Sequence, residues 1–258
     1  MPEHQLFNHA DWANPRWENE RIHVFGTSEA LADAAARLLI GVAQSAVAMR
    51  GEFMLVLSGG STPNAMYELL ATRYVDDVPW DKTHLFWGDE RFVPLDDEQS
   101  NFHAAHTHLI SRVPIRPEHT HAVATGLAST SEAAHAYEQT ITRVTGDRQP
   151  LFDLVFLGLG EDGHTASLFP GDDQADPSSS RLVQPIHGPE YRPPRDRVSL
   201  SATALSNTRC ATFLVAGAGK REALKAVLAR DASKPATLIR PKGMLIWYTD
   251  EAAAGQPG

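Results

Sequence analysis

A chain of 258 residues is long enough for one α/β domain, and its 42% hydrophobic and 21% charged residues are ordinary for a globular protein with a sizeable core. The net charge of −9 argues against binding to nucleic acid or an anionic membrane by bulk attraction, although a few focused donors can still bind a small anion. A single cysteine, Cys210, excludes an intrachain disulfide and fits a reducing compartment.

The N-terminal part of the chain predicts neither a signal peptide nor a membrane anchor. Its first residues, MPEHQLFNHADW, hold acids and histidines where a signal peptide has a basic and then an apolar run. The longest apolar stretch, residues 30–49, carries Asp33 and Arg37 four positions apart, so these side chains can pair on the wet face of a helix. We therefore expect an amphipathic helix rather than a membrane span, and a soluble, cytoplasmic protein.

Apolar runs and periodic segments alternate along the rest of the chain. Strands are expected at residues 22–25, 53–57, 84–87, 154–157, 197–201, 212–215 and 244–248. Helices are expected at residues 29–49, 63–71, 101–110, 131–144 and 220–230. This alternation predicts an α/β fold with a mostly parallel sheet and helices on both faces. We expect a single domain over residues 1–258, with a loop excursion at 171–196.

The segment MLVLSGGSTP, residues 54–63, runs from a buried strand into a glycine turn. Gly59 and Gly60 allow the backbone to approach an anion, and the hydroxyls of Ser61 and Thr62 add donors at the start of a helix. This favours binding of a phosphate monoester, with an ordinary N-cap and turn as the alternative. A proline follows Thr62 where a nucleophile elbow needs its last glycine, so we expect no covalent serine mechanism.

Three charged residues, Asp89, Glu90 and Arg91, follow the strand expected at 84–87. Arg91 could bind phosphate or a sugar oxygen, while Asp89 or Glu90 could hold Arg91 or orient a histidine of the site. The alternative is a surface salt-bridge cluster. Because parallel strands end at one edge of a sheet, convergence with the glycine turn favours a functional site.

Several histidines raise the question of a metal site. One helix can bring His103 and His106 to the same face, but His108 then points elsewhere. His119 and His121 lie nearby in the sequence, and no cysteine accompanies the group. We therefore expect no bound metal.

A G-x-G-x-x-G pattern at residues 158–163 follows the apolar run 154–157, as in dinucleotide-binding loops. Only residues 164–169 follow before a proline and a glycine end the element, so the long helix that receives a pyrophosphate is absent. No carboxylate stands about 20 positions further on, and Glu161 and Asp162 would repel a pyrophosphate. We therefore expect no dinucleotide cofactor.

The same loop places Asp162, Gly163 and His164 after a buried strand. A histidine there, at the start of a short helix, can be half exposed with one ring nitrogen free. Because its side chain titrates nearest neutral pH, it is suited to act as a general base on water. The alternative is a histidine that only caps or packs.

Together, LSGGSTP, WGDERFVP and GLGEDGHTASLFPG make the chain resemble the 6-phosphogluconolactonase family, with further support from RVSLS, FLVAGAGK and IRP. The likeness spans roughly residues 53–247. It implies a three-layer, Rossmann-like sheet without a nucleotide, similar to glucosamine-6-phosphate deaminase and ribose-5-phosphate isomerase.

The resemblance also implies roles for individual residues. His164, beside Asp162, would activate water for attack on a sugar-phosphate lactone, with no metal or cofactor. Backbone amides of Gly160 and Gly163 would stabilise the oxyanion. Residues expected to bind the substrate or its phosphate are Gly59, Gly60, Ser61, Thr62, Asp89, Glu90, Arg91, Arg197 and Lys220.

Two other functions remain as alternatives. A deaminase would be expected to continue the D-G-H turn with a segment like I-A-F-N-E-P, whereas residues 165–170 read TASLFP. A non-catalytic sugar-phosphate-binding regulator could dispense with His164, so the intact turn counts against it. We expect a small-molecule partner, no nucleic acid or membrane partner, and a monomer or weak homodimer.

Overall fold

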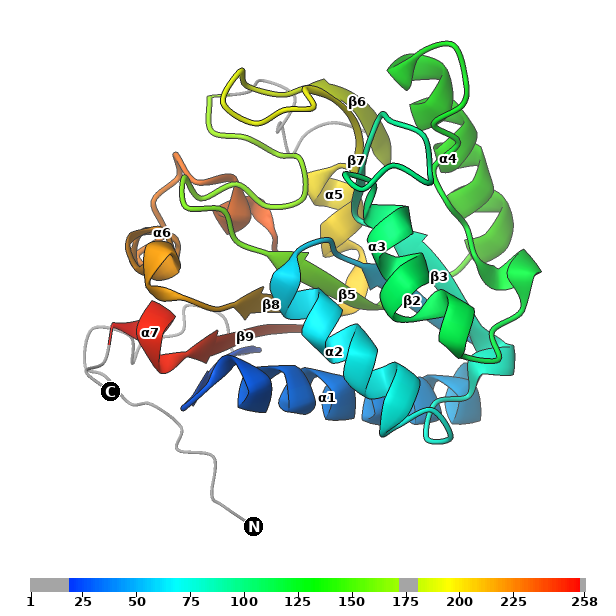
Figure 1. The fold of residues 1–258 in the computed structure, drawn as a ribbon, viewed down its shortest axis with the longest axis horizontal. Helices are drawn as coiled ribbons and strands as arrows, with labels where there is room; N and C mark the ends of the chain where they lie inside the picture. Colours follow the sequence, from blue (N-terminus) through cyan, green and yellow to red (C-terminus); the bar gives the residue numbers. More distant parts are fainter. Residues whose placement is uncertain (1–18, 172–180, 256–258) are drawn as a thin grey trace.

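The computed structural model describes residues 19–171 and 181–255. Its main sheet has six strands, all parallel, in the order β1-β9-β8-β5-β2-β3 (Figure 1). The bounds of these strands are β1 Glu20–Phe25, β9 Met244–Asp250, β8 Thr208–Val215, β5 Phe152–Gly158, β2 Phe53–Leu57 and β3 Thr83–Trp87. The predicted parallel α/β sheet is therefore confirmed.

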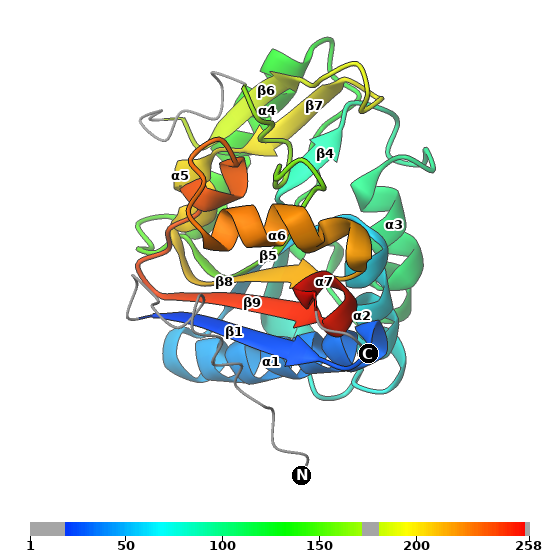
Figure 2. The same ribbon diagram turned by 90° about the vertical axis from the view of Figure 1, so that its left-hand side faces the viewer.

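A second sheet of three antiparallel strands lies beyond the helices on one face of the main sheet (Figure 2). It consists of β4 (Asp89–Arg91), β7 (Asp196–Leu200) and β6 (Val183–His187). Two predictions need correction here. The strand expected at 197–201 belongs to this second sheet, and the excursion expected at 171–196 contains a strand. Residues 172–180 of that excursion lie outside the described residues.

Helices cover both faces of the main sheet, as predicted. One face packs against α1 (Ser28–Arg50), α2 (Ser61–Thr72) and α3 (Asn101–His108). The other packs against α4 (Thr130–Thr145), α5 (Ala202–Ser206), α6 (Arg221–Leu228) and α7 (Glu251–Ala254). Short 3-10 turns lie at Trp80–Lys82, Ile110–Arg112, Pro117–His119, Ala218–Lys220 and Pro235–Leu238.

Alternating side chains of the buried strands fill two apolar layers. In β2, Phe53, Leu55 and Leu57 pack toward α1, α2 and α3, whereas Met54 and Val56 pack toward α4, α5 and α6. All five side chains are fully buried. A strand that is apolar on both faces must lie inside a three-layer structure, which explains why the sequence shows continuous apolar runs.

Helix α1 is long and apolar enough to cross a membrane by length and composition alone. Its buried face, which includes Leu31 and Leu39, packs in the core instead. The exposed face carries the predicted ion pair, in which Arg37 Nε lies 2.8 Å from Asp33 Oδ2. These contacts are typical of a core helix in a globular domain.

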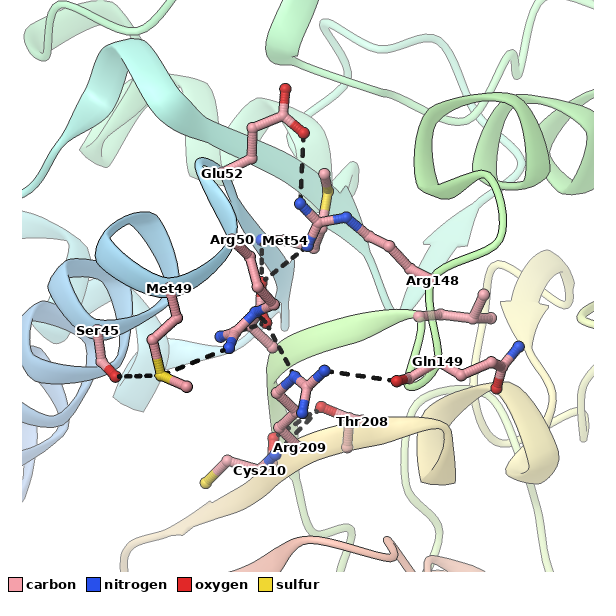
Figure 3. A network of polar contacts seen from close by, with 12 residues as sticks. Ser45, Met49, Arg50, Glu52, Met54, Arg148, Gln149, Thr208, Arg209 and Cys210 are labelled. Carbon is pink, nitrogen blue, oxygen red and sulfur yellow. Dashed lines mark hydrogen bonds and ion pairs between the residues drawn. The ribbon is translucent and has the colours of Figure 1, made fainter.

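A polar network joins the amino ends of three neighbouring strands (Figure 3). Asp153, at the start of β5, is 2% exposed and accepts hydrogen bonds from Met54 N at 2.9 Å and Arg50 Nε at 3.0 Å. Arg148 and Arg209 lie 3.6 and 3.5 Å from the same carboxylate. The amino ends of these strands are thus occupied by stabilising contacts, and the predicted site residues lie at the opposite, carboxyl ends.

Candidate active site at the carboxyl ends of the strands

A cavity of about 240 Å³ opens at the carboxyl ends of β8, β5, β2 and β3. This is the edge at which open α/β sheets place their ligands. Its lining consists of Ser58, Gly59, Gly60, Ser61, Thr62, Pro63, Asp89, Arg91, Asn101, Gly158, Leu159, Gly160, His164, Ala166, Arg192, Arg197, Leu214, Ala216 and Lys220. Most of the predicted site residues therefore meet in one cavity.

The glycine turn after β2, which the sequence predicts as an anion cradle, lies at the start of α2. Gly60 is the N-cap residue, with φ at 117°, and no side chain caps the helix. The first amides of a helix have no intrahelical partner, so Ser61 and Thr62 present N–H groups and hydroxyls at the cavity. The alternative was an ordinary turn in which a side chain caps the helix, and no such cap is present. The uncapped helix start therefore favours binding of a phosphate group.

Two contacts hold this turn in place. Tyr67, which is 1% exposed, donates a hydrogen bond to Ser58 O at 2.7 Å and accepts one from Ser58 N at 3.2 Å. The amide of Asn101 packs against Gly59 so closely that a Cβ there would lie 2.0 Å from Asn101 Oδ1. Gly59 is therefore required by close packing.

The turn after β5 carries the predicted base. His164 lines the cavity with its side chain 19% exposed, and its Nδ1 lies 2.5 Å from Asp162 Oδ1. An ionised carboxylate only accepts hydrogen bonds, so in the neutral imidazole this contact favours the tautomer with the proton on Nδ1 and the lone pair on Nε2. Burial acts to raise the pKa of Asp162, but hydrogen bonds from His164 and Tyr191 outweigh it, and the pKa lies well below its usual value.

Gly160 makes room for this imidazole. A Cβ at Gly160 would lie 2.0 Å from His164 Nδ1 and 2.6 Å from Asp162 Oδ1. The prediction that the amides of Gly160 and Gly163 stabilise the oxyanion is wrong, however. The amide of Gly160 donates to His164 O at 2.8 Å, and the amide of Gly163 donates to Gly160 O at 3.0 Å. Both donors are used in closing the turn.

The short helix expected from His164 is also absent. Residues 164–170 form turns, with an isolated bridge between Thr165 and Leu168. Thr165 Oγ1 donates to Gly158 O at 2.9 Å, and Ala166 adopts a φ of 48°, which is uncommon for a residue with a Cβ. Strain of this kind is concentrated at functional sites, and Ala166 lines the cavity.

Cationic side chains surround the cavity. Arg91 on β4 and Arg197 on β7 are register partners across the second sheet, which places them side by side. Arg197 is 6% exposed, and burial lowers its pKa, although a guanidinium remains charged at neutral pH. Lys220 adds a third cation from the segment after β8. The fourth cation, Arg192, was not predicted, because nothing in the sequence of a proline-rich loop marks one arginine as facing a site.

The two acidic residues after β3 have different environments. Asp89 lines the cavity, where its Oδ2 accepts from Ser167 Oγ at 2.5 Å and lies 3.8 Å from Arg197 Nη1. Glu90 is 1% exposed and accepts from the amides of Asn101 and Phe102 at 2.7 Å. The expectation that Glu90 binds substrate is therefore wrong, because its carboxylate caps the start of α3. Burial raises the pKa of Glu90, although the hydrogen bonds from these amides act to lower it.

The histidines considered for metal binding separate into two groups. His103, His106 and His108 lie on α3. His119 stacks on His84 at 3.9 Å between ring centroids, and His84 Nδ1 lies 3.0 Å from His121 Nε2. Within the described ranges, no group of three or more His, Cys, Asp or Glu side chains is placed to hold a metal ion.

Comparison with known protein families gives a match over residues 26–247 to the family described as glucosamine-6-phosphate isomerases/6-phosphogluconolactonase. The chain is 39% identical over 214 residues to a 6-phosphogluconolactonase of Synechocystis, covering 81% of this chain and 86% of the relative. It is 35% identical over 243 residues to that of Mycobacterium tuberculosis, covering 91% and 97%.

Solved structures show the same fold. The 6-phosphogluconolactonase of Thermotoga maritima superposes with a TM-score of 0.79 at 32% identity, covering 90% of this chain and 99% of that one. The Trypanosoma cruzi enzyme of the same name gives 0.82 at 27% identity, covering 91% and 95%. A monomeric glucosamine-6-phosphate deaminase also superposes at 0.79, but with 19% identity, so it shows the fold alone.

Proposed function

The chain belongs to the glucosamine-6-phosphate isomerase/6-phosphogluconolactonase family, and we propose that within it the chain hydrolyses 6-phospho-D-glucono-1,5-lactone to 6-phospho-D-gluconate. A relative that carries the lactonase name is 39% identical to it. The observation that carries the mechanism is that His164, which is paired with Asp162, and the anion cradle of α2 line the same cavity. A single small sugar phosphate can then contact both.

His164 acts as the general base. Its Nδ1 proton is held by Asp162, which leaves Nε2 to remove a proton from water. The water oxygen attacks the lactone carbonyl and gives a tetrahedral oxyanion. The protonated imidazole then donates its proton to the ring oxygen as the C1–O5 bond breaks, and the acid product forms. No nucleophilic side chain is needed.

The phosphate end of the substrate is bound by the cradle and the cations. The free amides and hydroxyls at the start of α2 donate hydrogen bonds to the phosphate oxygens, and Arg91, Arg192, Arg197 and Lys220 neutralise the charge of the phosphate. Asp89 holds Ser167 and Arg197 rather than the anion, because a carboxylate repels phosphate.

The test is the rate of hydrolysis of freshly generated lactone by the parent and by His164→Ala, with the spontaneous rate subtracted. Loss of the general base should lower kcat by about 10²- to 10⁴-fold, while calorimetry shows retained binding of 6-phosphogluconate. His135→Ala, an exposed histidine on α4, is the control and should keep the parent rate. Ammonia release from glucosamine 6-phosphate, with no lactone hydrolysis, would identify a deaminase instead.

A further inference from the structure

The segment between β6 and β7, residues 188–195, lies outside the main sheet and contacts the turn that carries Asp162 and His164. We call it the 188–195 loop. Its ends are tied together, because Gly188 N donates to Arg195 O at 2.7 Å and Arg195 Nε donates to Gly188 O at 3.0 Å. The buried Arg197 holds its middle, with hydrogen bonds to Pro194 O at 3.0 Å and Arg192 O at 3.1 Å.

Two adjacent side chains of this loop face different parts of the site. Arg192 lines the cavity. Tyr191 places its hydroxyl 3.1 Å from Asp162 Oδ2, the carboxylate oxygen that His164 does not use. Asp162 is therefore held at both oxygens, by the imidazole on one side and by the phenol on the other.

Packing does not account for this tyrosine. The residue is 64% exposed, and it is one of three large hydrophobic residues that are exposed in the described part of the chain. The hydroxyl meets a carboxylate, and hydrogen bonds to charged groups are stronger than those between neutral groups. Burial therefore stabilises this side chain little, and its hydrogen bond to Asp162 is the stronger interaction.

We propose that Tyr191 is a positioning residue that fixes the carboxylate of Asp162 and, through it, the orientation of the His164 imidazole. A carboxylate held at one oxygen can rotate about its χ2 torsion, whereas one held at both oxygens has one orientation. The orientation of the imidazole is then fixed as well, because its Nδ1 is hydrogen-bonded to that carboxylate. This inference rests on the proposed function, in which His164 is the base.

The first experiment compares the parent with Tyr191→Phe, which removes only the hydroxyl. Loss of one partly exposed hydrogen bond to a carboxylate should lower kcat about 3- to 10-fold and leave KM unchanged, because the residue does not contact substrate. Tyr248→Phe on β9, outside the cavity lining, is the matched control and should keep the parent kcat. An unchanged kcat in Tyr191→Phe, or a raised KM alone, would overturn the proposal.

A second experiment tests the contact between Tyr191 and Asp162 independently of catalysis. Burial and the neighbouring Asp162 both raise the pKa of Tyr191, so Asp162→Asn should lower it, as followed by NMR of ¹³C-labelled tyrosine. A phenol that titrates alike in the parent and in Asp162→Asn would show that the two side chains do not interact in solution. If the parent itself fails to hydrolyse the lactone, the proposed function is wrong, whereas this titration still decides whether the contact exists.

Discussion

Replacing Gly160 by alanine should separate catalysis from folding. The added Cβ would lie 2.0 Å from His164 Nδ1 and 2.2 Å from Cε1. To reach an ordinary contact of 3.4 Å, the imidazole must retreat by about 1.4 Å. The φ of Gly160 lies outside the left-handed region, so the backbone accepts alanine, and the atoms that must move belong to side chains. The domain should therefore fold while its base is displaced.

A misplacement of about 1 Å in a catalytic group can cost about 10²-fold in rate, equivalent to roughly 2.7 kcal/mol of transition-state stabilisation. We expect kcat of Gly160→Ala to fall by about that factor in the lactone assay. Binding of 6-phosphogluconate should stay within a few-fold of the parent, because the anion cradle lies on a different strand end.

The matched control is Gly126→Ala, where an added Cβ meets nothing within 4 Å. It should retain the parent kcat, and both variants should retain the parent thermal unfolding midpoint within a few degrees. If Gly160→Ala hydrolyses the lactone at the parent rate, the observed placement of the imidazole is not needed for catalysis, and the mechanism derived from it is refuted.

Three further predictions concern binding and stability. Arg91→Ala should raise KM for the phosphorylated lactone about 10- to 100-fold and leave the unphosphorylated lactone unaffected; equal effects on both would remove it from the phosphate site. Asp153→Asn should lower the free energy of unfolding by about 3 kcal/mol in urea, because three arginines lose a buried partner, with kcat of the folded protein unchanged. Burial and the charges of its histidine neighbours lower the pKa of His121 from 6.5 to about 4, so the fold favours the neutral ring. The contribution of the neutral ring to the free energy of unfolding is complete above pH 6.5 and should fall by about 3 kcal/mol as the pH drops to 4. Acid denaturation of His121→Gln should not show this loss.

The sequence predicted the layers of the fold because they depend on short-range patterns. The runs at 53–57 and 154–157 are apolar on both faces, which requires a buried parallel strand, and the structure places both in the sheet centre. The strands β4 and β6 were missed. They are short, and pairing with β7 rather than local periodicity makes them strands.

The sequence by itself also determined which residues come together at the cavity, since the loops that follow parallel strands lie at one edge of the sheet. The D-G-H turn, the glycine cradle and Arg91 were all predicted there, and all three lie at that edge. Only the tertiary structure decided what each polar group is free to do. Glu90 and the amide of Gly160 form hydrogen bonds to neighbouring backbone groups and are not available to a ligand. Arg192 and Tyr191 reach the site from a loop that is distant in the sequence. A hydrogen bond depends on distances between atoms that the chain brings together only on folding.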